Sequence, residues 1–231
     1  MGVVYAPYAN DANTLVLYHC RAGAGATVTD YSGNSNDGTC TDYTWNTGAI
    51  TGDYKITTGG TESRIELGTA LEFTGTDDFT IEGWTKNTAD VVASGKIFFY
   101  HGASGEVGKI SMNTNKTTGV CAGLVQDIDG NKVNVEGTTA INDGAWHHVA
   151  MTWDGSTGTA SIYTDGGDVD TATNANVDND LFRTNPHYTF GAAYSPGGGN
   201  WINELIGDFA EMRISDCVRT HFGGTRGAGQ S

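Results

Sequence analysis

The sequence predicts an all-β protein, a jelly-roll sandwich of two antiparallel sheets. β-rich segments, several with alternating apolar and polar residues, recur along the chain, and no segment has the apolar stripe of an amphipathic helix. The 34 glycines stand beside only 3 prolines, and Thr, Asn and Asp are abundant, which indicates many tight turns. An antiparallel chain of 231 residues hides its strand edges in a two-sheet jelly roll or a closed barrel, and the strand spacing favours the two-sheet form.

Eight segments are expected to be strands. The segment Thr80–Trp84 illustrates the pattern, because its alternation suits a sheet with one face turned inward and the other exposed or lightly covered. In chain order the expected strands are Leu15–Cys20, Phe79–Trp84, Lys96–Tyr100, Val120–Gln126, Lys132–Val135, His147–Trp153, Ala160–Thr164 and Ile206–Ile214. We expect Trp84, Val149 and Ile214 to lie inside the protein.

Asp-Gly pairs begin at Asp129, Asp143, Asp154 and Asp165, between these segments. Asp-Gly is a strong hairpin signal because both residues accept the left-handed conformation of primed turns. The second half of the chain is therefore expected to be a meander of hairpins. No shift in composition and no proline-rich linker divides the chain. We expect an N-terminal arm at residues 1–12, one domain at 13–220 and a Gly-rich C-terminal tail at 221–231.

The charge and the cysteines narrow the range of partners. The formal net charge is −15 without any cluster of Lys or Arg, so the protein repels phosphate backbones and nucleic acid is not an expected partner.

No long apolar run and no basic leader followed by an apolar stretch occur, so neither membrane insertion nor a signal peptide is expected. Cys20, Cys40, Cys121 and Cys217 are too far apart for a C-x-x-C site, and disulfides and buried free thiols both remain open.

Four segments carry motifs that occur together in one family. The strand Leu15–Cys20 is followed by a D-x-S-G-N-x-N-x-G loop at residues 30–38. F-T-I-E-G-W stands at 79–84, D-G-A-W-H-H-V-A at 143–150, and G-D-F-A-E-M-R-I at 207–214. In this order and spacing the chain resembles the laminin-G-like (concanavalin A-like) jelly-roll domains, from about residue 13 to residue 220. Two departures stand out: Arg21-Ala22 replaces the acidic pair that often follows the first strand, and Ala210 replaces the Asp of the closing motif.

The loop at residues 30–38 suggests calcium as a cofactor. It places side-chain oxygens at alternate positions with glycines between them, and Ca²⁺ prefers hard oxygen ligands from a flexible loop. The loop is not an EF-hand, because Ser35 and Thr41 stand where that motif needs Gly and Glu. The alternative interpretation is that the same side chains cap backbone N–H groups of their own loop. The expected ligands are Asp30, Asn34, Asn36 and Asp37, with Glu211, or less favourably Asp208, added because the resemblance implies neighbouring first and last strands.

Four aromatic residues are candidates for ligand binding. Tyr43, Trp45, Tyr194 and Trp201 lie among Gly, Asn and Asp in expected loops, where exposed rings can stack on sugars. The other interpretation is that they anchor loops or belong to the core. The adjacent His147 and His148 point to opposite faces of a strand and cannot chelate one metal, so we expect one packed and one exposed.

The sequence does not point to catalysis. No nucleophile motif such as G-x-S-x-G and no strand with an E-x-D-x-x-E pattern occurs. A glycoside hydrolase or polysaccharide lyase is the less favoured alternative, because carboxylates on different strands could still converge.

The expected function is therefore that of a non-catalytic surface structural or adhesion protein, such as a virion-associated or capsid-decorating subunit. Domains of this family usually work outside cells, and a virion protein reaches the outside by particle assembly without an export signal. We expect location on the virion surface, other protein subunits as partners in an oligomer or multi-copy assembly, and a terminal segment packed on a neighbour. The alternative is a secreted, extracellular carbohydrate-binding module with glycans as partners.

Overall fold

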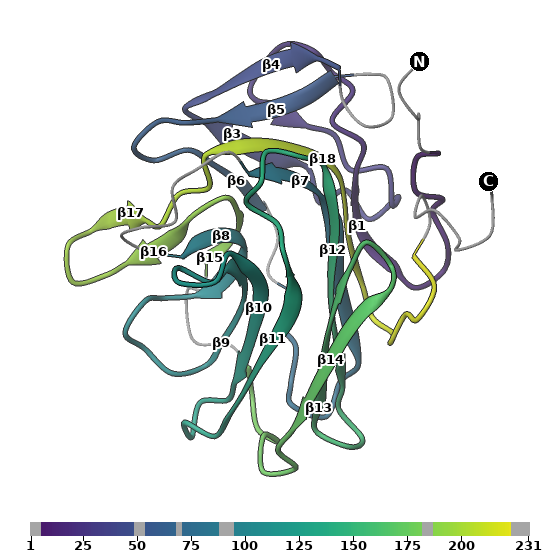
Figure 1. Ribbon diagram of the computed structural model, residues 1–231, viewed down its shortest axis with the longest axis vertical. Coiled ribbons are helices and arrows are strands. Elements are labelled where there is room, and N and C mark those ends of the chain that lie inside the picture. Colours follow the sequence, from purple (N-terminus) through teal and green to yellow (C-terminus); the bar gives the residue numbers. More distant parts are fainter. Residues whose placement is uncertain (1–5, 49–53, 68–70, 88–94, 182–186, 223–231) are drawn as a thin grey trace.

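The computed structural model describes residues 6–48, 54–67, 71–87, 95–181 and 187–222. These residues contain no helix, and hence none long and apolar enough to span a membrane. Sixteen of the strands belong to two eight-stranded antiparallel sheets that pack face to face (Figure 1). The jelly-roll sandwich predicted from the sequence is confirmed.

The first sheet contains both the first and the last strand of the chain. Its members are β1 (Thr14–Tyr18), β4 (Tyr43–Thr47), β5 (Tyr54–Thr58), β7 (Phe79–Asn87), β12 (His147–Asp154), β13 (Thr159–Thr164), β14 (Asp168–Thr173) and β18 (Gly207–Ser215). The strand order is β14-β13-β12-β7-β18-β5-β4, and β1 also pairs with β18. β18 pairs with β5 through Gly207–Phe209 and with β1 through Met212–Ser215, so the first and last strands are neighbours as expected.

The second sheet has the order β11-β10-β9-β8-β15-β6-β3-β2. Its members are β2 (Thr27–Val28), β3 (Gly38–Thr41), β6 (Arg64–Leu67), β8 (Lys96–Gly102), β9 (Lys109–Thr114), β10 (Val120–Gln126), β11 (Lys132–Ala140) and β15 (His187–Phe190). A separate hairpin of β16 (Ala193–Ser195) and β17 (Asn200–Ile202) projects beside β8 and β15 (Figure 1).

All eight predicted strands are present, with ends that differ by a few residues. Three of the four Asp-Gly pairs form the expected hairpins: Asp129 joins β10 to β11, Asp154 joins β12 to β13, and Asp165 joins β13 to β14. The prediction for Asp143 is wrong. The loop at Asp143 carries the chain from β11 in the second sheet to β12 in the first, so it connects two sheets rather than two paired strands.

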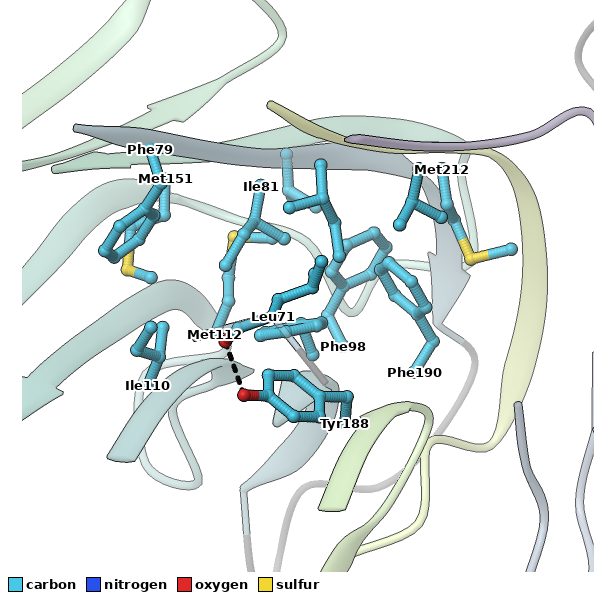
Figure 2. Close-up of a cluster of buried hydrophobic side chains, with 14 of the residues drawn as sticks. Leu71, Phe79, Ile81, Phe98, Ile110, Met112, Met151, Tyr188, Phe190 and Met212 are labelled. Carbon is cyan, nitrogen blue, oxygen red and sulfur yellow. Dashed lines mark hydrogen bonds between the residues drawn. The ribbon is translucent and has the colours of Figure 1, made fainter. Parts of the chain in front are cut away.

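The core lies between the two sheets (Figure 2). Val149 and Ile214 are fully buried in it, as expected. A register shift in β8 between Ile97 and Phe99 turns the intervening Phe98 into the core next to Phe99, an arrangement that simple alternation does not give. The labelled side chains in Figure 2 are Leu71, Phe79, Ile81, Phe98, Ile110, Met112, Met151, Tyr188, Phe190 and Met212, and the Tyr188 hydroxyl donates to the Leu71 carbonyl.

Trp84 is buried in a second apolar cluster, outside the sandwich core. It packs with Tyr8, Leu17 and Ala210, with Trp146 at the edge, on the outer face of the first sheet. This burial depends on the N-terminal arm, because Tyr8 belongs to residues 6–12, which pack on the chain's own sheet. The described part of the arm therefore packs within one chain. Residues 1–5 and 223–231 lie outside the described residues, so the expectation that at least one terminal segment packs on a neighbour stays a prediction.

The expectation that one of the two adjacent histidines is exposed is wrong. His148 is fully buried, and its Nε2 lies 3.1 Å from a Glu82 oxygen. His147 is also buried, since its ring is held between two carboxylates, with Nδ1 2.9 Å from Asp165 and Nε2 3.0 Å from Asp143. Both carboxylates come from the turns beside β12, so the ring needs no solvent contact.

Candidate functional site

The loop after β1 is folded around the carboxylate of Asp30. Oδ1 accepts hydrogen bonds from the backbone N–H groups of Leu17 and Ser32, both at 2.9 Å. Oδ2 accepts from the Ser32 hydroxyl at 2.6 Å and from the backbone N–H of Asn36 at 2.9 Å. Four donors thus converge on one carboxylate and fix the loop against β1.

The structure brings the other three loop candidates to the same place. The Asn34 and Asn36 amides each donate to the Leu15 carbonyl, at 3.1 and 2.9 Å, and the Asp37 carboxylate accepts from the Asp30 N–H at 2.8 Å. The bonds that Asp30 and Asp37 accept from N–H groups of the loop are those of the capping interpretation, whereas the two Asn amides tie the loop to β1. Within the described residues, no group of three or more His, Cys, Asp or Glu side chains is arranged to hold a metal ion. Calcium binding by the loop stays a prediction.

Glu211, the expected distant ligand, contacts a different part of the fold. It sits in a β-bulge of β18 with a φ of 49°, and its side chain lies on the outer face of the first sheet. Its Oε2 accepts from the backbone N–H of Tyr8 at 2.9 Å and lies 2.7 Å from Nδ1 of His19. Asp208 is likewise engaged elsewhere, with Lys55 and Thr57, both at 2.6 Å.

Tyr43 and Trp45 lie together on β4, at the edge of the first sheet. Their rings are 6.1 Å apart and nearly perpendicular, and both are half-buried against the core. The Tyr43 hydroxyl and the Trp45 Nε1 both donate to the carbonyl of Gly25, the latter at 2.8 Å. The pair therefore anchors the loop around Gly25 and keeps part of each ring in solvent.

Tyr194 and Trp201 face each other across the β16–β17 hairpin, with ring centroids 5.3 Å apart. The His187 ring packs against both, with its centroid 4.2 Å from that of Tyr194 and 5.1 Å from that of Trp201. The Arg64 guanidinium lies 4.0 Å from the centre of the Trp201 ring. Glu66 holds His187 at 3.1 Å. The hairpin is thus supported by packed rings, and one face of Trp201 is already covered by a cation.

A pocket of about 340 Å³ lies on the outer face of the second sheet, beside the hairpin. Its floor is formed by outward-facing side chains of adjacent strands. Asn113 of β9 lies opposite Ala122 of β10, and Leu124 of β10 lies opposite Asn134 of β11. Asn203, just after the hairpin, closes one side and fixes its position through its carbonyl, which accepts from the Ile97 N–H at 2.9 Å. We call this site the amide pocket.

Three side chains give the amide pocket its chemistry. The amides of Asn113, Asn134 and Asn203 make no hydrogen bond to another described residue, so their donors and acceptors face solvent. Lys116 and Glu136 stand at the rim, and Glu136 accepts from the Asn115 amide at 2.8 Å. Sequence reasoning missed these residues, although the alternation of K-V-N-V-E at 132–136 does place Asn134 and Glu136 on the exposed face.

A buried charge network occupies the outer face of the first sheet. The Arg213 Nε donates to Glu82 at 2.7 Å, and His148 approaches the other oxygen of Glu82. The Arg213 guanidinium also lies 4.8 Å from the ring of Tyr8, which covers it. Glu82 and Glu211 are both fully buried beneath the arm and already engaged. This network can hold the arm in place but presents no open carboxylate to a substrate.

The four cysteines are free. Cys20, Cys40 and Cys121 are buried, and Cys217 is half-buried. Burial raises the pKa of Cys40 and of Cys121 to about 12. These thiols are therefore protonated and unreactive at neutral pH.

A family model described as the concanavalin A-like lectin/glucanases superfamily matches residues 58–221. The chain belongs to this superfamily. The laminin-G-like resemblance found from the motifs is confirmed, and the loop at 30–38 lies before the matched range. No curated protein matches the chain.

Solved structures share the fold at low sequence identity. The binding domain of Paraclostridial Mosquitocidal Protein 1 aligns with a TM-score of 0.68 and 15% identity, over 90% of this chain and 50% of that one. The botulinum neurotoxin serotype D binding domain gives 0.63 and 13%, over 89% and 48%. A heptameric SAP-like pentraxin from Limulus polyphemus gives 0.53 and 16%, over 71% and 75%. The chain spans about half the length of the toxin binding domains. At these identities the structural similarity shows that the chains share a fold.

Proposed function

We propose that this chain is a non-catalytic adhesion domain that binds glycans in the amide pocket. The observation that carries the proposal is the set of three free Asn amides around a partly apolar floor. An amide both donates and accepts hydrogen bonds, as a sugar hydroxyl does. Ala122 and Leu124 offer an apolar surface for the C–H groups of a sugar ring, and pockets with a few placed polar groups on apolar walls are typical ligand sites.

The lining of the pocket supports a binding role rather than hydrolysis. Glu136 is the one carboxylate among the described lining residues, and it is paired with Asn115. Retaining hydrolysis needs two carboxyl groups about 5–5.5 Å apart, and inverting hydrolysis needs two that are farther apart. The solved structures with a similar fold include two that are named as binding domains, which agrees with this proposal.

Titration calorimetry against a panel of soluble oligosaccharides tests the proposal. We expect a saturable signal for at least one sugar, and a loss of at least tenfold in affinity for the double variant Asn113→Ala/Asn134→Ala. Asn176→Ala, an exposed Asn outside the pocket, is the matched control. Release of reducing sugar by the wild type, abolished in a single Asp or Glu variant, would show that the domain is an enzyme.

As the setting of this adhesion domain, we propose a multi-copy assembly on the surface of a virus particle. The observation that favours this setting is the four free cysteines. Disulfides are common in exported proteins and rare in those that fold in the cytoplasm, where virion proteins are made. The net charge of −15 keeps unassembled copies soluble and apart. A secreted carbohydrate-binding module is the alternative setting, with the same pocket.

Co-purification tests the setting. We expect the chain to sediment with assembled particles in a density gradient, in many copies per particle. Recovery as a secreted monomer that binds a glycan and no particle would replace the virion proposal with the secreted module.

A further inference from the structure

We infer that the amide pocket selects an uncharged sugar that carries an acetamido group, an N-acetylhexosamine at the end of a glycan. This inference rests on the proposed function and adds the class of ligand. An acetamido group presents a carbonyl acceptor, an N–H donor and a methyl group close together. A site that prefers it over a plain hexose must offer a donor, an acceptor and an apolar contact in the same small space.

The floor of the pocket has these three features in sequence across the sheet. Asn113 on β9 and Asn134 on β11 lie on either side of β10, whose outward side chains are Ala122 and Leu124. Strands in a sheet are about 4.8 Å apart, and Asn113 is opposite Ala122 whereas Asn134 is opposite Leu124. The two amides therefore flank the apolar strip diagonally, across roughly 10 Å of sheet. A group placed over Ala122 and Leu124 can thus receive a hydrogen bond from one amide and give one to the other.

The small side chain of Ala122 opens the space for the methyl group. It is buried but faces outward, between Asn113 of β9 and Glu136 of β11. The volume of about 340 Å³ lies at the lower end of the range for small-ligand pockets, about 300–1,000 Å³. The pocket therefore suits one or two sugar rings at the end of a chain rather than a long internal stretch.

The charges disfavour acidic sugars. Lys116 and Glu136 contribute opposite charges at the rim, so the pocket has no net charge to attract an acidic sugar. The overall charge of −15 repels sialylated or sulfated glycans.

The test compares sugars that differ in one group. Calorimetric titration of the full chain with N-acetylglucosamine, N-acetylgalactosamine, glucose, galactose and N-acetylneuraminic acid gives relative affinities. We expect at least one N-acetylhexosamine to bind tenfold or more tightly than its parent hexose, equivalent to about 1.4 kcal/mol. The acidic N-acetylneuraminic acid should bind more weakly than that N-acetylhexosamine, although it also has an acetamido group.

The outcomes separate the inference from the proposed function. Equal or tighter binding of the parent hexoses, or of the acidic sugar, overturns the inference and leaves glycan binding intact. Absence of binding to every mono- and oligosaccharide tested overturns both.

Two variants locate the preference in the pocket. Ala122→Leu fills the space for the methyl group and leaves the three amides in place, so it should reduce the preference to less than threefold. Asn134→Ala should lower the affinity tenfold, and because Asn134 is exposed, this change does not disturb the core. Asn176→Ala is the control for both. An unchanged preference in Ala122→Leu and Asn134→Ala, with unchanged melting temperatures, would place the sugar elsewhere and contradict the assignment.

Discussion

His147 is held by a carboxylate on each side of its ring. The hydrogen bond to Asp165 raises the pKa of His147, and Asp143 adds to the effect, although burial acts in the opposite direction. A histidine with a raised pKa in the folded state takes up a proton on folding, so its contribution to stability falls as the pH rises. The contribution is complete below the unfolded pKa of about 6.5 and disappears as the pH passes the higher folded value.

We therefore expect the free energy of unfolding to decrease between about pH 6 and pH 8. His147→Gln should give a flatter profile over that range, measured by urea unfolding at constant ionic strength. His221→Gln, at an exposed position, is the control and should keep the wild-type slope. A wild-type slope that is unchanged in His147→Gln would contradict the role assigned to the ring.

The carboxylates of Asp143 and Asp165 affect stability in a separate, acidic pH range. The hydrogen bond from the Ala145 N–H lowers the pKa of Asp143 most, and the hydrogen bond with His147 lowers it further. Burial raises the pKa of Asp165, but His147 and the His148 N–H outweigh it, so the net shift is also downward. Their stabilising effect is present above the unfolded pKa of about 3.9 and is lost as the pH falls through the lower folded values.

The carboxylate of Asp30 provides a second prediction for a single residue. It accepts three backbone N–H groups and one hydroxyl, and Asp30→Ala would leave those donors without their partner. We expect the variant to lose about 2–4 kcal/mol, since bonds to charged groups contribute about 1.5–3 kcal/mol each and are not additive. Chemical denaturation measures the loss, with the exposed Asp216→Ala as control.

The same variant tests calcium binding by the loop. If the loop binds Ca²⁺, a free Ca²⁺ concentration of 100 times the dissociation constant would raise the wild-type free energy of unfolding by about 2.7 kcal/mol. Melting scans with EDTA and with excess Ca²⁺ should therefore differ for the wild type and coincide for Asp30→Ala. Identical scans for both proteins would leave the capping bonds as the whole role of the loop.

The N-terminal arm acts as part of the first sheet's outer layer. Tyr8 is 2% exposed, and it covers Trp84 and the Arg213 guanidinium. Truncating a buried aromatic side chain costs about 3–5 kcal/mol. We expect Tyr8→Ala to lower the free energy of unfolding by about that amount. The change in urea midpoint measures it, and Tyr54→Ala, at a residue 39% exposed, should cost much less.

Deletion of residues 1–10 should therefore destabilise the domain as well as remove the arm. From the sequence alone, this deletion is expected to leave the domain folded but to impair its incorporation into a particle. A deletion variant with the wild-type urea midpoint would contradict the role of Tyr8.

The sequence predicts every described strand of seven or more residues, whereas the six-residue strands β9 and β14 were missed. β7 and β12 have nine and eight residues of β-rich sequence, and both were recognised. β2 has two residues and β17 has three, too few for an alternation to appear. The β-bulge at Glu211 was also beyond sequence reasoning, because the extra residue in β18 is defined only by its pairing with β7.

The proposed binding site, the amide pocket, depends on the whole molecule. Asn113, Asn134 and Asn203 are distant in sequence and meet because β9, β10 and β11 pair in one register and the hairpin folds back over β8. Each alternation could be read from the sequence, but the register between strands could not. The sequence placed the aromatic candidates Tyr194 and Trp201 in a loop, but they are the cross-strand pair of the β16–β17 hairpin, which lies beside the pocket.

The oxidation state of the four cysteines can be used to test the compartment in which the protein folds. All four cysteines are free, and burial protects three of them. Reaction of the native protein with a thiol reagent at pH 8 should therefore modify Cys217 first and leave Cys20, Cys40 and Cys121 slow, because a thiolate is the reacting species and burial raises the pKa of each. After unfolding without a reductant, all four thiols should react. Protein purified from its natural source that shows fewer than four thiols on unfolding contains a disulfide, and that result would favour export from the cell over assembly in the cytoplasm.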